Sequence, residues 1–242
     1  MHPNYEYFLK HSEGRGKVLD YGCGVGLCVE EGLRRGIDIW GADIFEWDED
    51  YHGKPPEHLI GKVLEIQLET LALPYPDAHF DFVYCNMVFE HVENIDRALS
   101  EIARVLKPDG EFFAAFPGKE SLVEAHVRIP FIHWIPKNAS FRMWYMIMMR
   151  RLGLGAGAEG KGPREWAEHQ LKYLDQYTFY RTRRELAEAY ASAGLNIKNI
   201  EEDYLGFRMT PLAKLFSMAS FFSRLLSRAL GAQVIAATKK KL

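Results

Sequence analysis

The spacing of apolar and polar positions predicts strands that alternate with helices through the first half of the chain. Short apolar runs occupy residues 17–21, 37–43, 58–66, 80–86 and 111–116, and the fourth is rich in aromatic and β-branched residues. Strands that alternate with helices form a parallel sheet with helices on both faces. We therefore expect an α/β, doubly wound fold.

Helix signals fill the intervals between these runs. One predicted helix follows Gly26 and ends at Gly36, because glycine readily takes the left-handed conformation at a helix C-terminus. Leu99, Ile102 and Leu106 share one face of a second helix, which the turn sequence KPDG should end. Each of these helices precedes a predicted strand, as the alternation requires.

The regular alternation stops at Pro117. Residues 117–181 contain no evident strand, and we interpret them as a helical insertion after the fifth strand. A helix begins again at Thr182, whose spacing to Glu185 is that of a capping box. The insertion is thus flanked on both sides by segments with regular patterns.

The end of the chain predicts two further strands, at 196–204 and 232–240. Between them, the segment 208–230 has the apolar spacing of a helix and carries basic but no acidic side chains. The sequence has no internal repeat, and its length suits one large domain. We therefore expect residues 1–242 to form a single domain.

Composition narrows the class of protein. Hydrophobic residues make up 48% and charged residues 26%, as in soluble globular proteins. The net charge of −3 argues against a nucleic-acid partner, which would favour a basic excess. The charge is uneven, because residues 208–242 contain seven Lys or Arg and no Asp or Glu. The rest of the chain therefore carries about −10.

The sequence predicts a cytoplasmic protein. Its N-terminus lacks the basic start and apolar run of a secretory signal, and the uncharged stretch between Lys214 and Arg224 is shorter than the ~20 residues of a membrane span. Cys23, Cys28 and Cys85 form no CxxC pair, and an odd number of cysteines fits reduced thiols.

A glycine-rich loop follows the first strand. Gly22, Gly24 and Gly26 lie between a strand and a helix, where nucleotide-type folds bind ligands, and Asp43 ends the next strand, where an acid can bind a ribose diol. The spacing is GxGxG rather than the GxGxxG of dinucleotide-binding proteins. Asp20 would repel a pyrophosphate and suits a ligand with an ammonium group, which disfavours a nicotinamide cofactor.

Four segments in order resemble the successive motifs of class I S-adenosylmethionine-dependent methyltransferases. They are VLDYGCGVG, GADI, LALPYPDAHFDFVYCNMVFEHV and EIARVLKPDGEFFAAFP, within residues 16–117. The resemblance implies a Rossmann-like, mostly parallel seven-stranded sheet with an antiparallel last strand. It also implies S-adenosylmethionine as methyl donor and S-adenosylhomocysteine as product.

Carried over residue by residue, the resemblance implies twelve cofactor contacts. They are Asp20, Gly22, Cys23, Gly24 and Gly26 near the methionine end, Asp43 and Ile44 at the ribose, Glu69, Thr70 and Leu71 beside the adenine, and Asn86 and Met87 facing the amino group. At Glu69 the family usually has Asp after a glycine, and this chain departs from that pattern.

Methyl transfer by in-line displacement depends mainly on alignment, because the sulfonium is already electrophilic. A hydroxyl acceptor would also need a base, and His91 in FEHV and His126 in VEAHVRIP are the candidate catalytic residues. Alternatively, His91 braces its loop or contacts the cofactor. We interpret His133 as a loop histidine bonded to a carbonyl, and we expect no metal, since two histidines seven apart do not form a helical ligand pair.

The insertion at 117–181 should bind the acceptor. Its methionine-rich stretch 141–149 and the apolar segment 208–230 favour a hydrophobic or lipid-linked acceptor, and the basic C-terminal segment suits peripheral contact with an anionic membrane. We expect a small or lipid-linked acceptor that is methylated at oxygen. Core packing and solvated lysines explain the same features. The glycine-rich 153–162 suggests a hinge. Two alternatives stay open, a non-catalytic S-adenosylmethionine-binding partner subunit and a nicotinamide-dependent oxidoreductase.

Overall fold

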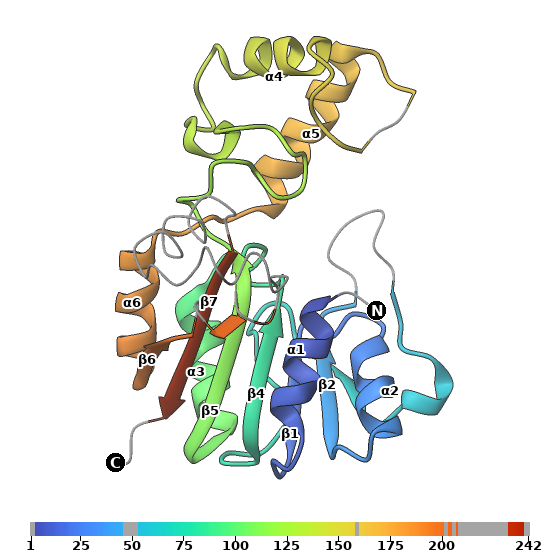
Figure 1. Cartoon of the computed structure of the whole chain (residues 1–242), viewed down its shortest axis with the longest axis vertical. Helices are drawn as coiled ribbons and strands as arrows, with labels where there is room; N and C mark the ends of the chain where they lie inside the picture. Colours follow the sequence, from blue (N-terminus) through green and yellow to red (C-terminus); the bar gives the residue numbers. More distant parts are fainter. Residues whose placement is uncertain are drawn as a thin grey trace.

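The computed structural model shows a seven-stranded sheet with helices on both faces (Figure 1). It describes residues 3–45, 53–157, 160–200, 203–204, 207 and 232–239. The predicted helix within 208–230 lies outside these residues. Within the described ranges, no helix combines the length and the apolar character that crossing a bilayer requires.

The strand order is β3-β2-β1-β4-β5-β7-β6. The strands are β1 (Val18–Tyr21), β2 (Ile39–Asp43), β3 (Val63–Glu65), β4 (Phe80–Asn86), β5 (Leu106–Pro117), β6 (Leu195–Asn199) and β7 (Ala232–Lys239). The first five pair in parallel, whereas β7 runs antiparallel to both β5 and β6. This confirms the Rossmann-like sheet and its antiparallel last strand.

Six α-helices are described, together with two short 3-10 turns, at Glu57–Leu59 and Ile132–Trp134. The helices are α1 (Pro3–Ser12), α2 (Leu27–Arg34), α3 (Ile95–Val105), α4 (Arg142–Arg151), α5 (Pro163–Tyr177) and α6 (Arg183–Ser192). The predicted capping box at the start of α6 is present, since Thr182 and Glu185 bond to each other's backbone amides.

Alternation along the strands builds a separate core on each face of the sheet. In β4, Val83 and Cys85 join the core that contains α3 and α6, while Phe82 and Tyr84 join the core that contains α1 and α2. Successive strand side chains point to opposite faces, so a strand buried on both sides is apolar throughout. Cys85, like the other two cysteines, is a buried free thiol.

Two predicted strand boundaries are wrong. The third strand covers only Val63–Glu65, because Glu57–Leu59 form a 3-10 turn before it. Leu106 was expected at the end of a helix, but it has an extended backbone and pairs with Phe80 as the first residue of β5. The KPDG segment therefore lies within β5, at the point where the pairing between β4 and β5 shifts register. The helical spacing of Leu106 gives no sign of its sheet partner.

Both ends of the regular fold also differ from prediction. The sixth strand ends at Asn199, and Tyr204 lies in a helical turn instead of the strand. The Tyr204 ring packs edge-on against Tyr7 of α1. Helix α1 was not predicted. Its Tyr7, Phe8 and Leu9 are consecutive and fully buried, so they follow neither helical nor strand spacing. Because this helix is buried on several sides, its apolar residues do not have the one-sided spacing from which a helix is predicted.

The insertion after β5 extends beyond the carboxyl ends of the parallel strands and ends in α4 and α5 (Figure 1). Its described residues contain no strand, as predicted, and they have a small core of their own around Trp166 and Met146. The glycine-rich stretch contacts this core. A Cβ on Gly155 would lie 2.5 Å from the Trp166 ring, and Trp166 Nε1 donates to the Gly157 carbonyl at 2.9 Å.

Candidate active site

A cavity of about 1090 Å³ opens at the carboxyl ends of β1, β2 and β4. This is where open α/β sheets bind ligands. Eleven of the fourteen predicted site residues line it, namely Gly22, Cys23, Gly24, Asp43, Ile44, Glu69, Thr70, Leu71, Asn86, Met87 and His91. Asp20, Gly26 and His126 are not among the described residues of the lining.

The glycine loop serves both the cavity and the packing beneath it. Gly22 has a φ of 76°, and a Cβ there would lie 2.2 Å from the Val88 side chain. At Gly26, with a φ of 87°, a Cβ would meet Leu59 at 2.8 Å and Val63 at 3.1 Å. Only glycine fits both positions without strain. Gly26 therefore matters for the packing of α2 rather than for the cavity wall.

Asp43 joins the end of β2 to this loop. Its Oδ2 accepts a hydrogen bond of 2.6 Å from the Gly24 N–H, and its Oδ1 accepts one of 2.7 Å from the Ile44 N–H. Burial raises the pKa of Asp43, and these backbone hydrogen bonds oppose the rise. The carboxyl group is thus held in one orientation at the cavity wall.

Asp20 lies beneath the loop. Its side chain is buried, and burial raises its pKa to about 8, against the opposing effect of a hydrogen bond with Tyr84. Burial therefore favours the neutral form of this carboxyl group. Asp20 is not among the described residues that line the cavity, and its contact with the methionine end of the cofactor stays a prediction.

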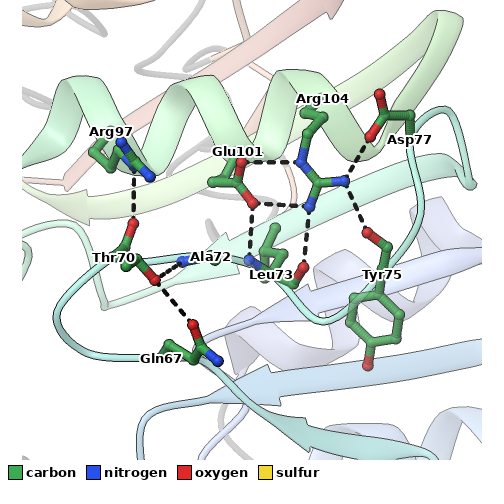
Figure 2. A network of polar contacts seen from close by, with 9 residues as sticks. All are labelled: Gln67, Thr70, Ala72, Leu73, Tyr75, Asp77, Arg97, Glu101 and Arg104. Carbon is green, nitrogen blue, oxygen red and sulfur yellow. Dashed lines mark hydrogen bonds and ion pairs between the residues drawn. The ribbon is translucent and has the colours of Figure 1, made fainter.

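The loop between β3 and β4 carries Glu69, Thr70 and Leu71, and Figure 2 shows how it is attached to α3. Arg97 Nε donates to the Thr70 carbonyl at 2.9 Å, and the Thr70 hydroxyl donates to Gln67 Oε1 at 3.2 Å. These bonds hold the three predicted residues against the cavity. Arg97, which also lines the cavity, was not predicted.

Arg104 is the centre of the same network (Figure 2). It donates to the carbonyls of Leu73 at 3.0 Å and Tyr75 at 2.9 Å, and it pairs with Glu101 and Asp77. Arginine can satisfy several acceptors at once because its guanidinium group carries five donors in a fixed plane. The loop's position therefore depends on a helix more than twenty residues further along the chain.

The end of β4 forms another wall. The Met87 N–H donates to the Ala115 carbonyl of β5 at 2.7 Å, and Met87 itself has a left-handed φ of 58°. Asn86 Oδ1 accepts a hydrogen bond of 2.8 Å from Asn4 Nδ2. This contact brings α1 to the site, and Tyr5 of α1 joins the lining.

His91 is oriented by the insertion. Its Nδ1 lies 2.6 Å from the carbonyl oxygen of Tyr177, at the end of α5. A carbonyl can only accept, so Nδ1 carries the proton in this contact and Nε2 is the basic nitrogen of the neutral ring. The geometry thus assigns the tautomer of a histidine at the cavity wall.

His126 lies directly behind His91, with 4.9 Å between the ring centroids. Its Nδ1 is 2.8 Å from Glu124 Oε1, which also accepts from the Tyr180 hydroxyl. Burial would lower the pKa of His126, but the bond to Glu124 outweighs it and raises the pKa. Burial would likewise raise the pKa of Glu124, and hydrogen bonds, first that with His126, lower it instead.

Glu90 completes this cluster and was not predicted. It is buried, and neither carboxylate oxygen has a hydrogen-bond partner within the described residues. Burial raises its pKa to about 8. One ligand atom each from Glu90, His91 and His126 lies within 4.8 Å of the others, a spacing that can hold a metal ion. Sequence spacing does not reveal this group, because Glu90 and His91 follow β4 whereas His126 lies in the insertion.

His133 behaves as predicted for a loop histidine. Its Nε2 lies 3.0 Å from the Ser121 carbonyl and 2.9 Å from the Ser121 hydroxyl. Burial lowers its pKa, so the neutral ring is favoured. Of the three histidines weighed in this region, only His91 lines the main cavity.

The fold is that of class I S-adenosylmethionine-dependent methyltransferases. The YcgJ protein from Bacillus subtilis superposes with a TM-score of 0.56 at 16% identity over 100% of both chains. An S-adenosylmethionine-dependent methyltransferase from Mesorhizobium loti superposes with a TM-score of 0.54 at 16% identity, over 98% of this chain and 96% of that one.

The family model described as "Methyltransferase domain" matches residues 1–199, and the chain belongs to this family. A sterol 24-C-methyltransferase of Gibberella zeae is 36% identical over 114 residues, which are 45% of this chain and 30% of the relative. A ubiquinone biosynthesis O-methyltransferase of Dechloromonas aromatica is 36% identical over 102 residues, which are 40% of this chain and 42% of the relative. The matches thus span less than half the length of these relatives.

Proposed function

We propose that this protein uses S-adenosylmethionine to methylate an oxygen atom of a small or lipid-linked acceptor, with S-adenosylhomocysteine as product. The observation that carries the proposal is His91, which lines the cavity and whose Nδ1 contact with the Tyr177 carbonyl leaves Nε2 as the basic nitrogen of the neutral ring. Loss of a proton from a hydroxyl acceptor needs such a group within reach of the acceptor.

The cavity fits the cofactor. Asp43 at the end of β2 and Glu69 in the loop after β3 carry carboxyl groups that suit a ribose diol and an adenine amino group. Gly22 and Gly24 leave their part of the wall without side chains. Ligand pockets usually measure about 300–1000 Å³, so a cavity of about 1090 Å³ has room for cofactor and acceptor together. When bound, S-adenosylmethionine supplies a methyl group on a positively charged sulfur.

In this proposal His91 accepts the proton that the acceptor hydroxyl loses, and His126 supports His91 from behind. His126 is behind the wall, where its bond to Glu124 favours the cationic ring. A carboxyl oxygen of Glu90 lies within 4.8 Å of a ring nitrogen of each of these histidines. This arrangement links the cavity wall to a buried group of titratable side chains, along which a proton taken by His91 can be shared.

The acceptor class is supported by the lining and by the relatives. Met87, Val88, Val92 and Phe179 contribute apolar surface, and Gln176, Tyr177 and Phe179 come from the insertion that we propose as the acceptor cap. The relatives include one protein named for sterol 24-C-methylation, a transfer to carbon, and one named for ubiquinone biosynthesis O-methylation. The second name supports transfer to oxygen.

Calorimetric titration with S-adenosylmethionine, S-adenosylhomocysteine and NADH tests the cofactor, and formation of S-adenosylhomocysteine with phenolic, quinol, amine and glycolipid acceptors tests the reaction. We expect binding of the first two ligands and turnover with an oxygen acceptor. Tight binding of NADH alone would refute the assignment. Binding without turnover on any acceptor would favour a non-catalytic subunit.

The same assay should be run after chelation and after addition of a divalent metal. Under our proposal, His91 acts as a base and chelation leaves turnover unchanged. Turnover that is lost on chelation and restored by the metal would instead assign Glu90, His91 and His126 to a metal site.

A further inference from the structure

One face of α4 exposes large apolar side chains at the outer end of the insertion. Phe141, Trp144 and Leu152 are 54%, 63% and 68% exposed. At 3.6 residues per turn these positions fall within about 80° of one another around the helix. Figure 1 shows α4 as the part of the insertion farthest from the sheet. This apolar face is thus well separated from the cofactor cavity.

The opposite face of α4 fixes the helix in place. Met146 is fully buried with Trp166 and Leu174, and buried Arg142 pairs with Asp175 of α5. Beside the apolar face, the Tyr145 hydroxyl donates to the Pro130 carbonyl at 2.7 Å. Because these contacts orient the helix, the side that carries Trp144 faces outward as part of the folded structure.

The segment of the chain that contains this face carries charges of one sign. Residues 125–157 contain five Lys or Arg and no Asp or Glu. Arg128, Lys137 and Arg151 are exposed, while Arg142 is buried in its ion pair and Arg150 lies over the Trp166 ring. Exposed Trp, Phe and Leu next to basic side chains form the pattern of helices that lie in the interface of an anionic bilayer.

Area argues against a second copy of the chain. Large aromatic side chains bury about 150–250 Å² each, so a stripe of two aromatics and one leucine offers on the order of 400 Å². A stable protein interface buries about 800 Å² on each partner. A membrane needs no matching surface of fixed shape, and a short stripe suffices for reversible binding.

We propose that the exposed face of α4, formed by Phe141, Trp144 and Leu152, docks the protein peripherally on an anionic lipid surface. Docking places the insertion, which also contributes residues to the cavity, next to the membrane. The docking surface is separate from the site of the proposed methyl transfer, and docking does not depend on which acceptor is methylated.

The test is sedimentation of the full chain with vesicles of phosphatidylcholine alone or mixed with phosphatidylglycerol. We expect binding to the mixed vesicles, at least tenfold weaker for the double variant Phe141→Ser/Trp144→Ser, since each buried aromatic contributes well over a factor of ten. Ile60→Ser is the matched control, because Ile60 is 72% exposed and lies outside the insertion. Arg151→Gln should reduce the preference for anionic vesicles about fivefold, because one basic side chain near the surface contributes about 1 kcal/mol.

Cofactor affinity serves as the check on folding, since the double variant should bind S-adenosylhomocysteine like the wild type. Equal vesicle binding by the wild type and the double variant would overturn the proposal, as would a wild type that binds no vesicles. A dimer in light scattering that the double variant converts to a monomer would overturn it in favour of a second copy. None of these results bears on methyl transfer, which is assayed separately.

Discussion

Asp43 accepts a hydrogen bond of 2.6 Å from the backbone N–H of Gly24, and this bond connects two strand ends that are adjacent only in the folded sheet. The proposed ribose-binding acid is thereby oriented before any ligand arrives. Preorganisation of this kind lowers the entropy lost when a ligand binds.

Replacing Asp43 by alanine should weaken S-adenosylmethionine binding by at least tenfold, because hydrogen bonds to a charged group contribute about 1.5–3 kcal/mol each. Calorimetric titration measures the change. Asp38→Ala is the matched control, since Asp38 lies just before the opposite end of the same strand and pairs with Lys62 at the surface. Equal affinities for the two variants would remove Asp43 from the cofactor site.

Gly22→Ala should destabilise the fold more than Gly36→Ala. Both glycines have a similar φ, 76° and 78°, so both substitutions place alanine in the left-handed region at a cost of about 1–2 kcal/mol. A Cβ at Gly22 also meets Val88 at 2.2 Å, whereas one at Gly36 meets nothing within 4 Å. Overpacking adds about 1–3 kcal/mol. Urea denaturation compares the two, and equal losses would show that Val88 moves aside freely.

His91→Asn should lower turnover by a factor of about 10²–10⁴ while cofactor affinity stays within about threefold. Asparagine can still donate to the Tyr177 carbonyl, so the variant removes the basic nitrogen and keeps the contact that orients the loop. His133→Asn is the control, because His133 bonds to Ser121 away from the main cavity. Turnover at the wild-type rate in His91→Asn would leave His91 as a structural residue.

Asp20→Asn should reduce the loss of stability that we expect as pH rises. The folded protein holds the Asp20 proton up to a pKa of about 8, while an unfolded aspartate loses it near pH 4. Between these values the native state binds more protons. The free energy of unfolding therefore falls with rising pH, by at most about 1.4 kcal/mol per pH unit for this group.

Urea denaturation at pH 5, 6.5 and 8 measures this slope, and asparagine cannot contribute to it. The slope, rather than the absolute stability, is the readout, because the amide changes the local hydrogen bonds at every pH. Asp38→Asn, at a half-exposed site, should leave the slope as in the wild type. A slope unchanged in Asp20→Asn would mean that this carboxyl group is ionised in the folded protein.

Local signals in the sequence predicted local structure well. The capping box of Thr182 and Glu185 and the glycine loop before α2 both depend on residues a few positions apart, and both are present. Boundaries were less reliable where a distant partner competes. Leu106 has helical spacing to Ile102, yet pairing with Phe80 places it in β5, because a sheet partner outweighs a small helix propensity.

By itself, the sequence determined the alternating α/β order, the glycine loop with Asp43, and the order of the motifs that place the chain in its family. Each of these features depends on the residues of short sequence segments and on the order of those segments along the chain. Only the tertiary structure decided that His91 faces the cavity while His126 is behind it, and that Glu90 joins them. Those residues belong to separate segments, and only packing of the insertion against the end of β4 brings their side chains together.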